Sequence, residues 1–213
     1  SFDIPEFTAN VDALGSLRIL EAIRVLNLQR KTKYYQASTS EIFGNTQIPQ
    51  NEKTIFRPRS PYAIAKLYAY WTTVNFREAY NIFAVNGILF NHEGPRRGEN
   101  FVSRKITTAV SEIFKKKRKF FTLGNIDAKR DWGSAKDYVE SMWLMLKAKK
   151  PSDYVIGSGK SYTVKHFVEE AFRYVNIKIV WKGKGLKEVG YNKENGQVYV
   201  KIDPVYFRPT EIN

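Results

Sequence analysis

The sequence predicts an α/β fold built on a parallel sheet, because segments of strand length alternate with segments of helical periodicity. Residues 33–38 and 84–90 have the length of strands, and the second segment is apolar enough to be buried on both faces. Residues 8–26 carry apolar side chains at helical spacing, and residues 61–80 have the length of a helix and are rich in aromatic side chains. With 213 residues, 43% of them hydrophobic, the chain is long enough for one sizeable domain, or one and a half.

Each helix of the first half has its own evidence in the sequence. Residues 8–26 place apolar side chains such as Val11 and Leu14 one turn apart. The second helix begins after Ser60, a favoured N-cap residue, with Pro61, which is well tolerated at the first helical position. Both segments are therefore predicted to be helices.

The alternation of helices and strands continues in the second half of the chain. Helices are predicted at 102–114, 134–147 and 164–175, and strands at 120–123, 154–156, 178–181 and 198–202. A polar, Gly-containing loop is expected between the last two strands.

The composition narrows the classes of function. The 35 basic and 21 acidic residues give a formal net charge of +14, which favours polyanionic partners, either nucleic acid or phosphorylated cofactors and substrates. With no Cys and two His, disulfides are excluded, no metal site is expected, and a reducing, cytoplasmic location suits the chain. No apolar run approaches the ~18 residues of a membrane span, so a soluble protein without a membrane partner is expected.

The segment 157–161 (Gly-Ser-Gly-Lys-Ser) is similar to a phosphate-binding P-loop but lacks its first glycine. A P-loop requires a glycine five residues before the last one, and this chain has Tyr154 there. The segment is therefore predicted to be a tight turn between a strand and a helix.

A tyrosine and a lysine four residues apart lie at the start of the predicted helix 61–80. Tyr62 falls in the first turn, where the positive end of the helix dipole favours a phenolate. Lys66 lies one turn further on the same face, and its charge lowers the pKa of such a phenol. A tyrosine in this setting is suited to act as general base toward an alcohol. The same spacing recurs at Tyr174 and Lys178, but late in a helix and without these features.

Hydroxyl and carboxyl groups follow the predicted strand 33–38. Thr39, Ser40 and Glu41 come directly after it, and the carboxyl ends of parallel strands are where α/β sheets place their ligands. A glutamate that is partly desolvated in such a cleft has a raised pKa and is suited to exchange protons with carbon and oxygen. Taken locally, the same residues are equally compatible with the capping of a turn.

Longer motifs span nearly the whole chain. They are Tyr-Gln-Ala-Ser-Thr-Ser-Glu (35–41), Pro-Arg-Ser-Pro-Tyr (58–62), Lys-Leu-Tyr-Ala-Tyr-Trp (66–71), Asn-Gly-Ile-Leu-Phe-Asn-His-Glu (86–93), Pro-Arg-Arg-Gly (95–98), Arg-Asp-Trp-Gly (130–133), Lys-Asp-Tyr-Val (136–139) and Tyr-Phe-Arg-Pro-Thr-Glu (206–211). In kind and order they resemble the extended, nucleotide-sugar branch of the short-chain dehydrogenases/reductases, and within it the GDP-mannose 4,6-dehydratase family.

The resemblance implies a Rossmann-like parallel sheet, the C-terminal part of an extended short-chain dehydrogenase/reductase, with a smaller substrate-binding lobe. Residues 1–98 are then expected to form the back half of an NADP-binding Rossmann domain that carries the catalytic residues. Residues 99–213 are expected to form mostly the GDP-sugar lobe, interleaved with the final Rossmann elements.

The resemblance also implies roles for individual residues. The expected catalytic residues are Thr39, Glu41, Tyr62 and Lys66; the expected NADP-binding residues are Tyr62, Lys66, His92 and Arg97; and the expected GDP-mannose-binding residues are Ser40, Asn91, Lys105, Arg130, Arg208 and Glu211. The side-chain chemistry agrees with these roles, because arginine offers a planar donor fork that matches a diphosphate.

The implied activity is that of a hydro-lyase, which converts GDP-mannose to GDP-4-keto-6-deoxy-mannose. Tyr62 takes the proton of the 4-hydroxyl while hydride leaves C4 for NADP, assisted by Thr39. The ketone acidifies C5, Glu41 removes the C5 proton, and water departs from C6. Hydride then returns to C6, so the net change is the loss of water.

Part of the family's pattern has no counterpart in the chain. The Gly-rich first βα turn and the early strands are missing, and a Rossmann first half would need on the order of 80 residues ahead of Ser1. The sequence also stops short of the family's final helices. We therefore expect a fragment of a longer protein that binds NADP poorly by itself.

Partners and alternative functions complete the expectations. Helices 8–26 and 61–80 are expected to pack against their copies in a homodimer or tetramer, as is common in this branch. Another nucleotide-sugar dehydratase, an epimerase or an inactive relative stay open, although Glu41 argues against an epimerase, which needs no base at C5. A basic nucleic-acid-binding protein is disfavoured, because the aromatic side chains fall mostly at predicted buried positions and not in a basic stripe.

Overall fold

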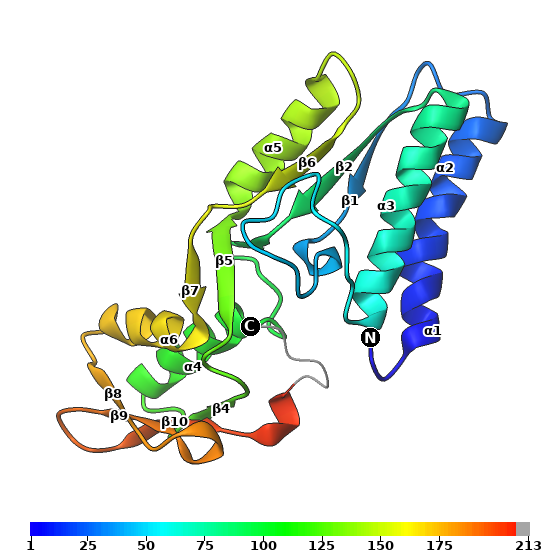
Figure 1. Ribbon diagram of the computed structural model, residues 1–213. Coiled ribbons are helices and arrows are strands. Elements are labelled where there is room, and N and C mark those ends of the chain that lie inside the picture. The colour runs from blue at the N-terminus through cyan, green and yellow to red at the C-terminus, as the bar shows by residue number, and fades with distance from the viewer. Residues whose placement is uncertain (208–213) are drawn as a thin grey trace. The chain divides into compact units, whose positions relative to one another are not determined.

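The computed structural model describes residues 1–207, which form two compact units. The first unit comprises Ser1–His92 and Trp132–Gly159, and the second comprises Glu93–Asp131 and the chain from Lys160 onward. The chain thus leaves the first unit, returns to it, and leaves it again (Figure 1).

The first unit is built on a parallel sheet with the strand order β1-β2-β6. Its strands are β1 (Lys33–Ala37), β2 (Phe83–Leu89) and β6 (Asp153–Ile156). The central strand β2 is buried from its second residue to its last, as the sequence predicted for an apolar segment covered on both faces. Ala37 pairs with Gly87, so the carboxyl ends of β1 and β2 lie at the same edge.

Helices cover both faces of this parallel sheet. Helices α2 (Gly15–Val25) and α3 (Pro61–Tyr80) lie side by side on one face, and α5 (Ala135–Lys147) lies on the other (Figure 1). Leu20 of α2 and Phe76 of α3 belong to one core cluster with Ala84 of β2. The first predicted helix begins earlier than expected, with α1 (Pro5–Thr8), and passes through a π-helical turn, Ala9–Leu14, before α2.

Helix α3 has capping residues at both ends. Ser60 is its N-cap, and the Ser60 Oγ accepts a hydrogen bond from the Ala63 amide (3.1 Å), while Pro61 occupies the first helical position. At the other end Asn81 adopts the left-handed conformation, with a φ of 55°. The start predicted from Ser60 and Pro61 is confirmed.

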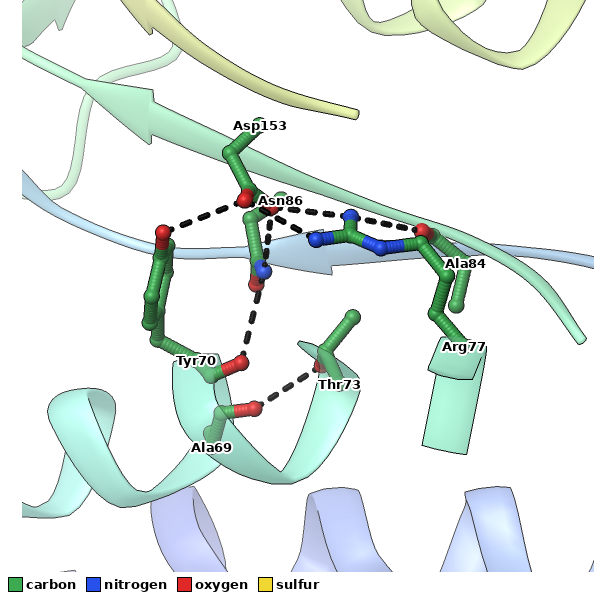
Figure 2. A network of polar contacts seen from close by, with 7 residues as sticks. All are labelled: Ala69, Tyr70, Thr73, Arg77, Ala84, Asn86 and Asp153. Atoms are coloured by element: carbon green, nitrogen blue, oxygen red, sulfur yellow. Dashed lines mark hydrogen bonds and ion pairs between the residues drawn. The ribbon is translucent and has the colours of Figure 1, made fainter. Parts of the chain in front are cut away.

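A buried polar network joins α3 to two strands of the sheet (Figure 2). Asp153, at the start of β6, accepts hydrogen bonds from Tyr70 Oη (3.1 Å) and Asn86 Nδ2 (2.8 Å). The Arg77 guanidinium donates two more to Asp153 (2.9 and 3.0 Å) and one to the Ala84 carbonyl (3.1 Å). Because α3, β2 and β6 all contribute, the network fixes the helix in position against both strands.

The second unit packs two helices with a mixed sheet. Helices α4 (Val102–Phe114) and α6 (Val164–Arg173) contribute Ile106 and Val168, both fully buried, to its core. The sheet has the order β4-β10-β9-β8, with β4 (Phe121–Leu123) parallel to β10 (Val198–Ile202) and the strands β9 (Val189–Asn192) and β8 (Ile179–Lys182) antiparallel. The ring of Phe172 stacks on that of Tyr199, with centroids 5.6 Å apart.

The structure corrects the sequence prediction at several short strands. The strands β3 (Asn91–Glu93), β5 (Lys129–Ser134), β7 (Ser161–Thr163) and β9 were not predicted, and the first three form a sheet in the order β3-β5-β7. The turn predicted at 157–161 therefore leads into β7 and not directly into a helix, and the predicted polar loop contains β9. These four strands consist mostly of polar or small residues, so no apolar run marks them in the sequence.

Candidate active site

The first group of predicted catalytic side chains lies where β1 ends. Thr39 has an extended backbone and begins the 3-10 turn Ser40–Ile42, and its Oγ1 accepts a hydrogen bond from the Glu41 amide (3.2 Å). The Glu41 carbonyl accepts a hydrogen bond from the Gly44 amide (3.2 Å), so the backbone of Glu41 is held on both sides. This geometry confirms that Thr39 caps a turn, while its catalytic role stays a prediction.

The second group lies in the first two turns of α3. Tyr62 is the second residue of the helix, and Lys66 follows one turn later with its Nζ 5.7 Å from the centre of the Tyr62 ring. Ser60, the N-cap of the same helix, has its Oγ 3.5 Å from Glu41 Oε2. The structure thus brings the carboxylate of Glu41 next to the start of the helix that carries the tyrosine and the lysine.

Lys66 is largely buried and pairs with Asp12. The side chain of Lys66 is 14% exposed, and its Nζ lies 3.8 Å from Asp12 Oδ1, in the π-helical turn. Burial lowers the pKa of the Lys66 ammonium from its ordinary value of 10.5, because the charge loses hydration, and the Asp12 carboxylate opposes part of that change. Asp12 thus partly compensates Lys66 for the hydration that it loses on burial.

His92 is held in one orientation by a hydrogen bond and by stacking. Its Nδ1 lies 2.9 Å from the Phe90 carbonyl oxygen, which assigns the proton to Nδ1 and makes Nε2 the acceptor nitrogen of the neutral ring. The ring stacks on Tyr138, with centroids 4.7 Å apart. Gly133 permits this arrangement, because a Cβ at that position would lie 2.4 Å from the Tyr138 ring.

In the second unit, Arg97 lies between an acid and an aromatic ring. Its Nε is 3.2 Å from Glu93 Oε2, and its Cζ is 3.5 Å from the centre of the Phe101 ring. Ser103 donates a hydrogen bond to the same Glu93 oxygen (2.5 Å). These contacts hold the guanidinium plane, whose outer nitrogens form the donor fork that matches a phosphate.

The residues predicted to bind the substrate are distributed over both units. In the second unit, Lys105 of α4 has its Nζ 3.5 Å from the centre of the Tyr206 ring, and Arg130 of β5 donates a hydrogen bond to the Lys129 carbonyl (2.7 Å). In the first unit, the half-buried residues Ser40 and Asn91 follow β1 and β2. Arg208 and Glu211 lie outside the residues that the structure describes.

The whole chain, residues 1–213, matches the sequence model of the family described as GDP-mannose 4,6 dehydratase. The chain belongs to the GDP-mannose 4,6-dehydratase family. The resemblance inferred from the motifs is thereby confirmed.

Members of the GDP-mannose 4,6-dehydratase family from distant organisms are similar to the chain over its whole length. It is 58% identical to the GDP-mannose 4,6 dehydratases of Drosophila melanogaster and Homo sapiens over 214 residues. It is 56% identical over 214 residues to the GDP-mannose 4,6-dehydratase of Sinorhizobium fredii (strain HH103). Each comparison covers 100% of the chain but only 54%, 58% and 61% of these relatives, in the same order. The chain thus spans little more than half their length.

Solved structures confirm the fold class. The structure of RMD from Pseudomonas aeruginosa complexed with NADPH matches with a TM-score of 0.79 at 20% identity, covering 95% of this chain and 64% of that one. The dTDP-glucose 4,6-dehydratase from Bacillus anthracis in complex with NAD matches with a TM-score of 0.72 at 19% identity, covering 92% and 56%. At these identities the likeness concerns the fold, and it agrees with the predicted Rossmann-like parallel sheet.

Three contacts at the candidate site were not predicted from the sequence of this family member. Asp12 beside Lys66 and Tyr138 beside His92 join residues far apart in the chain, and no local pattern signals either contact. Ser60 was expected only as the cap of α3, although its position two residues before Tyr62 could have indicated a place at the site.

Residues 1–207 contain neither a cluster of metal ligands nor a membrane-spanning helix. Within that range, no group of three or more His, Asp or Glu side chains is arranged to hold a metal ion. No helix described there has both the length and the apolar character that crossing a membrane requires.

Proposed function

We propose that the complete protein is a GDP-mannose 4,6-dehydratase, a cytoplasmic hydro-lyase that removes water from the sugar of GDP-mannose. The observation that carries the proposal is the contact between Glu41 and the start of the helix that bears Tyr62 and Lys66. The proposed reaction needs one base that removes the proton of the 4-hydroxyl and a second base that removes the proton of C5. Tyr62 and Glu41 are suited to these two tasks.

NADP is the cofactor that we propose, bound by Tyr62, Lys66, His92 and Arg97. The described side chains fit this group: Lys66 offers a buried ammonium as a donor to ribose hydroxyls, and Arg97 offers a held donor fork for a phosphate. His92 offers an oriented ring with an acceptor nitrogen. When bound, NADP supplies the acceptor for the hydride of C4 and the donor of the hydride that C6 receives.

The side chains of the chain handle the protons of the reaction. Tyr62, as phenolate, takes the proton of the 4-hydroxyl as C4 becomes a ketone, and the Thr39 hydroxyl donates a hydrogen bond to the same oxygen. The ketone acidifies C5, and the Glu41 carboxylate takes the C5 proton. The electron pair of the broken C5–H bond forms the C5–C6 double bond while the C6–O bond breaks, and the leaving hydroxyl takes the proton back from Glu41 and departs as water. When C6 gains hydride, C5 regains a proton, which balances the proton held by Tyr62.

The substrate-binding positions follow the family pattern. We propose Ser40, Asn91, Lys105 and Arg130, together with Arg208 and Glu211 outside the described residues. The cations among them suit the diphosphate of a nucleotide sugar. We also propose that residues 1–98 belong to the cofactor domain and that residues 99–213 belong mostly to the GDP-sugar lobe.

A second copy of the chain is the partner that we propose for the outer face of α2 and α3. Ile64, Tyr68 and Trp71 lie at helical spacing on α3, expose 58%, 44% and 55% of their surface, and line a shallow apolar groove together with Leu17 of α2. The same face on a second copy would cover them about a two-fold axis, because a symmetric dimer buries the same surface on both subunits. The expected assembly is a homodimer or tetramer.

Light scattering tests the proposed dimer face. Trp71→Lys should lower the measured molar mass, because a charge would be buried at the interface. Trp143→Lys on α5 is the matched control, since Trp143 is 56% exposed in the same unit, and it should leave the mass unchanged. An unchanged mass in both variants would exclude this face as the interface.

The activity is tested first by mass spectrometry of GDP-mannose incubated with NADP and with the protein expressed from its complete gene. The expected result is a product lighter by one water. Glu41→Gln should abolish the loss of water while GDP-mannose still binds, because the amide keeps the shape of the carboxylate but cannot take a proton. Glu78→Gln, an exposed glutamate far along α3, is the matched control and should leave the activity in place.

Two other outcomes would contradict the proposal. Unchanged GDP-mannose in the presence of demonstrably bound NADP would favour a different nucleotide sugar or an inactive relative. A product of unchanged mass with an inverted carbon, seen by nuclear magnetic resonance, would favour an epimerase.

A further inference from the structure

Ser60 takes part in two interactions at the point where α3 begins. Its Oγ accepts a hydrogen bond from the Ala63 amide (3.1 Å), which caps the helix. The same Oγ lies 3.5 Å from Glu41 Oε2. The Ala63 amide is itself a donor and cannot accept the hydroxyl proton of Ser60. That proton is therefore directed to the Glu41 carboxylate, which is an acceptor.

We propose that Ser60 is a positioning residue that holds the Glu41 carboxylate in place for removal of the C5 proton. The inference rests on the proposed function, because it concerns one step of the dehydration. Ser60 does not touch the reacting carbons in this role; it acts through Glu41.

The two proton-handling groups come from separate elements of the first unit. Glu41 belongs to the turn after β1, whereas Tyr62 belongs to α3. The backbone of Glu41 is fixed by Thr39 and Gly44, but three side-chain torsions lie between that backbone and the carboxylate. The hydrogen bond from Ser60 restrains those torsions from the side of α3, so that the carboxylate keeps its place relative to the phenol of Tyr62.

The chemistry of the elimination step explains why that restraint matters. The C5 proton passes to Glu41, the electron pair of the C5–H bond forms the C5–C6 double bond, and the C6–O bond breaks as the leaving oxygen takes the proton from Glu41 to form water. A carboxylate displaced by about 1 Å from such a proton loses on the order of 10²-fold in rate. A hydrogen bond that is long in the unliganded protein commonly shortens in the substrate complex, and a bond to a carboxylate is among the stronger kinds.

The oxidation at C4 should respond differently from the elimination. It depends on Tyr62 and Lys66, whose positions on α3 do not require the bond between Ser60 and Glu41. Loss of that bond should therefore slow the elimination about 10- to 100-fold and change the oxidation at C4 by less than about threefold.

Single-turnover experiments on the full-length enzyme separate these two steps. The absorbance of the reduced nicotinamide rises as C4 is oxidised and falls again once the elimination has occurred. Ser60→Gly removes the donor while glycine remains an acceptable N-cap residue, so the absorbance should rise at about the parent rate, reach a higher level and fall more slowly. Ser60→Thr, which keeps both the donor and the cap, should restore most of the rate of the fall.

Two further variants separate positioning from capping. Thr163→Gly removes a comparable cap in the second unit, where Thr163 Oγ1 accepts a hydrogen bond from the His166 amide (3.0 Å), and it should leave both phases unchanged. Ser60→Asp keeps a strong cap but has no proton to donate and places a second negative charge beside Glu41. This variant should fold like the parent, as judged by thermal unfolding, and should eliminate water more slowly than Ser60→Gly.

The outcomes distinguish the inference from the proposed function. If the parent dehydrates GDP-mannose and Ser60→Gly shows the parent's time course, Ser60 does not position Glu41 and only the inference is overturned. The inference is likewise overturned if Ser60→Gly and Ser60→Asp slow the rise and the fall equally, because that is a general structural effect. If the parent releases no water, the proposed function is overturned, and the inference with it.

Discussion

Removal of the Asp153 carboxylate tests how α3 is held against the sheet. In Asp153→Ala the Arg77 guanidinium, 14% exposed, loses its anion, and Tyr70 and Asn86 lose a shared acceptor. All of these groups lie on α3, β2 or β6 (Figure 2). The first unit should therefore become less stable, and α3 less firmly placed.

The size of the effect follows from the burial of the ion pair. Removing one partner of a buried pair costs about 3–5 kcal/mol, because the other charge stays buried and unpaired. Asp153 is itself 19% exposed, and Arg77 keeps its hydrogen bond to the Ala84 carbonyl, so that some of the loss is compensated. We therefore expect a decrease of about 3 kcal/mol in the free energy of unfolding.

Urea unfolding measures this decrease against a control of the same kind. Glu112→Ala breaks the ion pair with Arg118 (2.8 Å), whose partners are 37% and 41% exposed, and it should cost less than about 1 kcal/mol. The double variant Asp153→Ala with Arg77→Met should recover part of the stability, since no charge is then left buried. A cost for Asp153→Ala no greater than that of the control would refute the reasoning.

Two further predictions concern side chains at the candidate site. Gly133→Ala places a Cβ 2.4 Å from the Tyr138 ring, so the ring must move from its stack on His92. The dissociation constant of the full-length protein for NADP, measured by titration calorimetry, should then rise several-fold, and an unchanged constant would argue against His92 as a cofactor residue. Asp12→Asn removes the charge that opposes the effect of burial on Lys66, so the pKa of Lys66 should fall further, as measured by the pH dependence of amine labelling. Because the folded-state pKa lies below that of the unfolded chain, burial of the ammonium costs its full amount of stability below the folded-state pKa, and this cost decreases as the pH rises from the folded-state pKa to the unfolded-state pKa. In Asp12→Asn the cost of burying the ammonium should begin to decrease at a lower pH than in the parent. A decrease that begins at the same pH as in the parent would contradict the assigned role of Asp12.

The elements that the sequence predicted well are those with local signals. Helix α3 was placed from Ser60 and Pro61, whose capping chemistry acts within one turn, and the bounds of α4 followed from helical spacing alone. Short strands such as β7 escaped prediction, because they are fixed by their neighbours in a sheet and not by their own residues.

At the candidate site, too, local motifs were recognisable in the sequence, whereas contacts between residues far apart in the chain were not. The family motifs marked Glu41, Tyr62 and Lys66, and the structure brings the first of them next to the helix that carries the other two. The pairing of Lys66 with Asp12 depends on the π-helical turn that contains Asp12. The spacing of the apolar residues in the sequence does not predict such a turn. The sequence thus indicated which residues to propose for the site, whereas the contacts that orient each of them became visible only in the structure.

The π-helical turn Ala9–Leu14 also makes this part of the fold tolerant of a change in length. Such a turn accommodates one residue more than a regular α-helical turn. Deleting one residue within it would restore an ordinary helix and leave Leu20 and Ile23 of α2 in their core cluster. Everything before the deletion would rotate by about 100° around the helix axis, which is the angle per residue of an α-helix. Loss of one residue after Asp12 in this turn should therefore rotate its carboxylate away from Lys66, while Leu20 and Ile23 stay packed in their cluster.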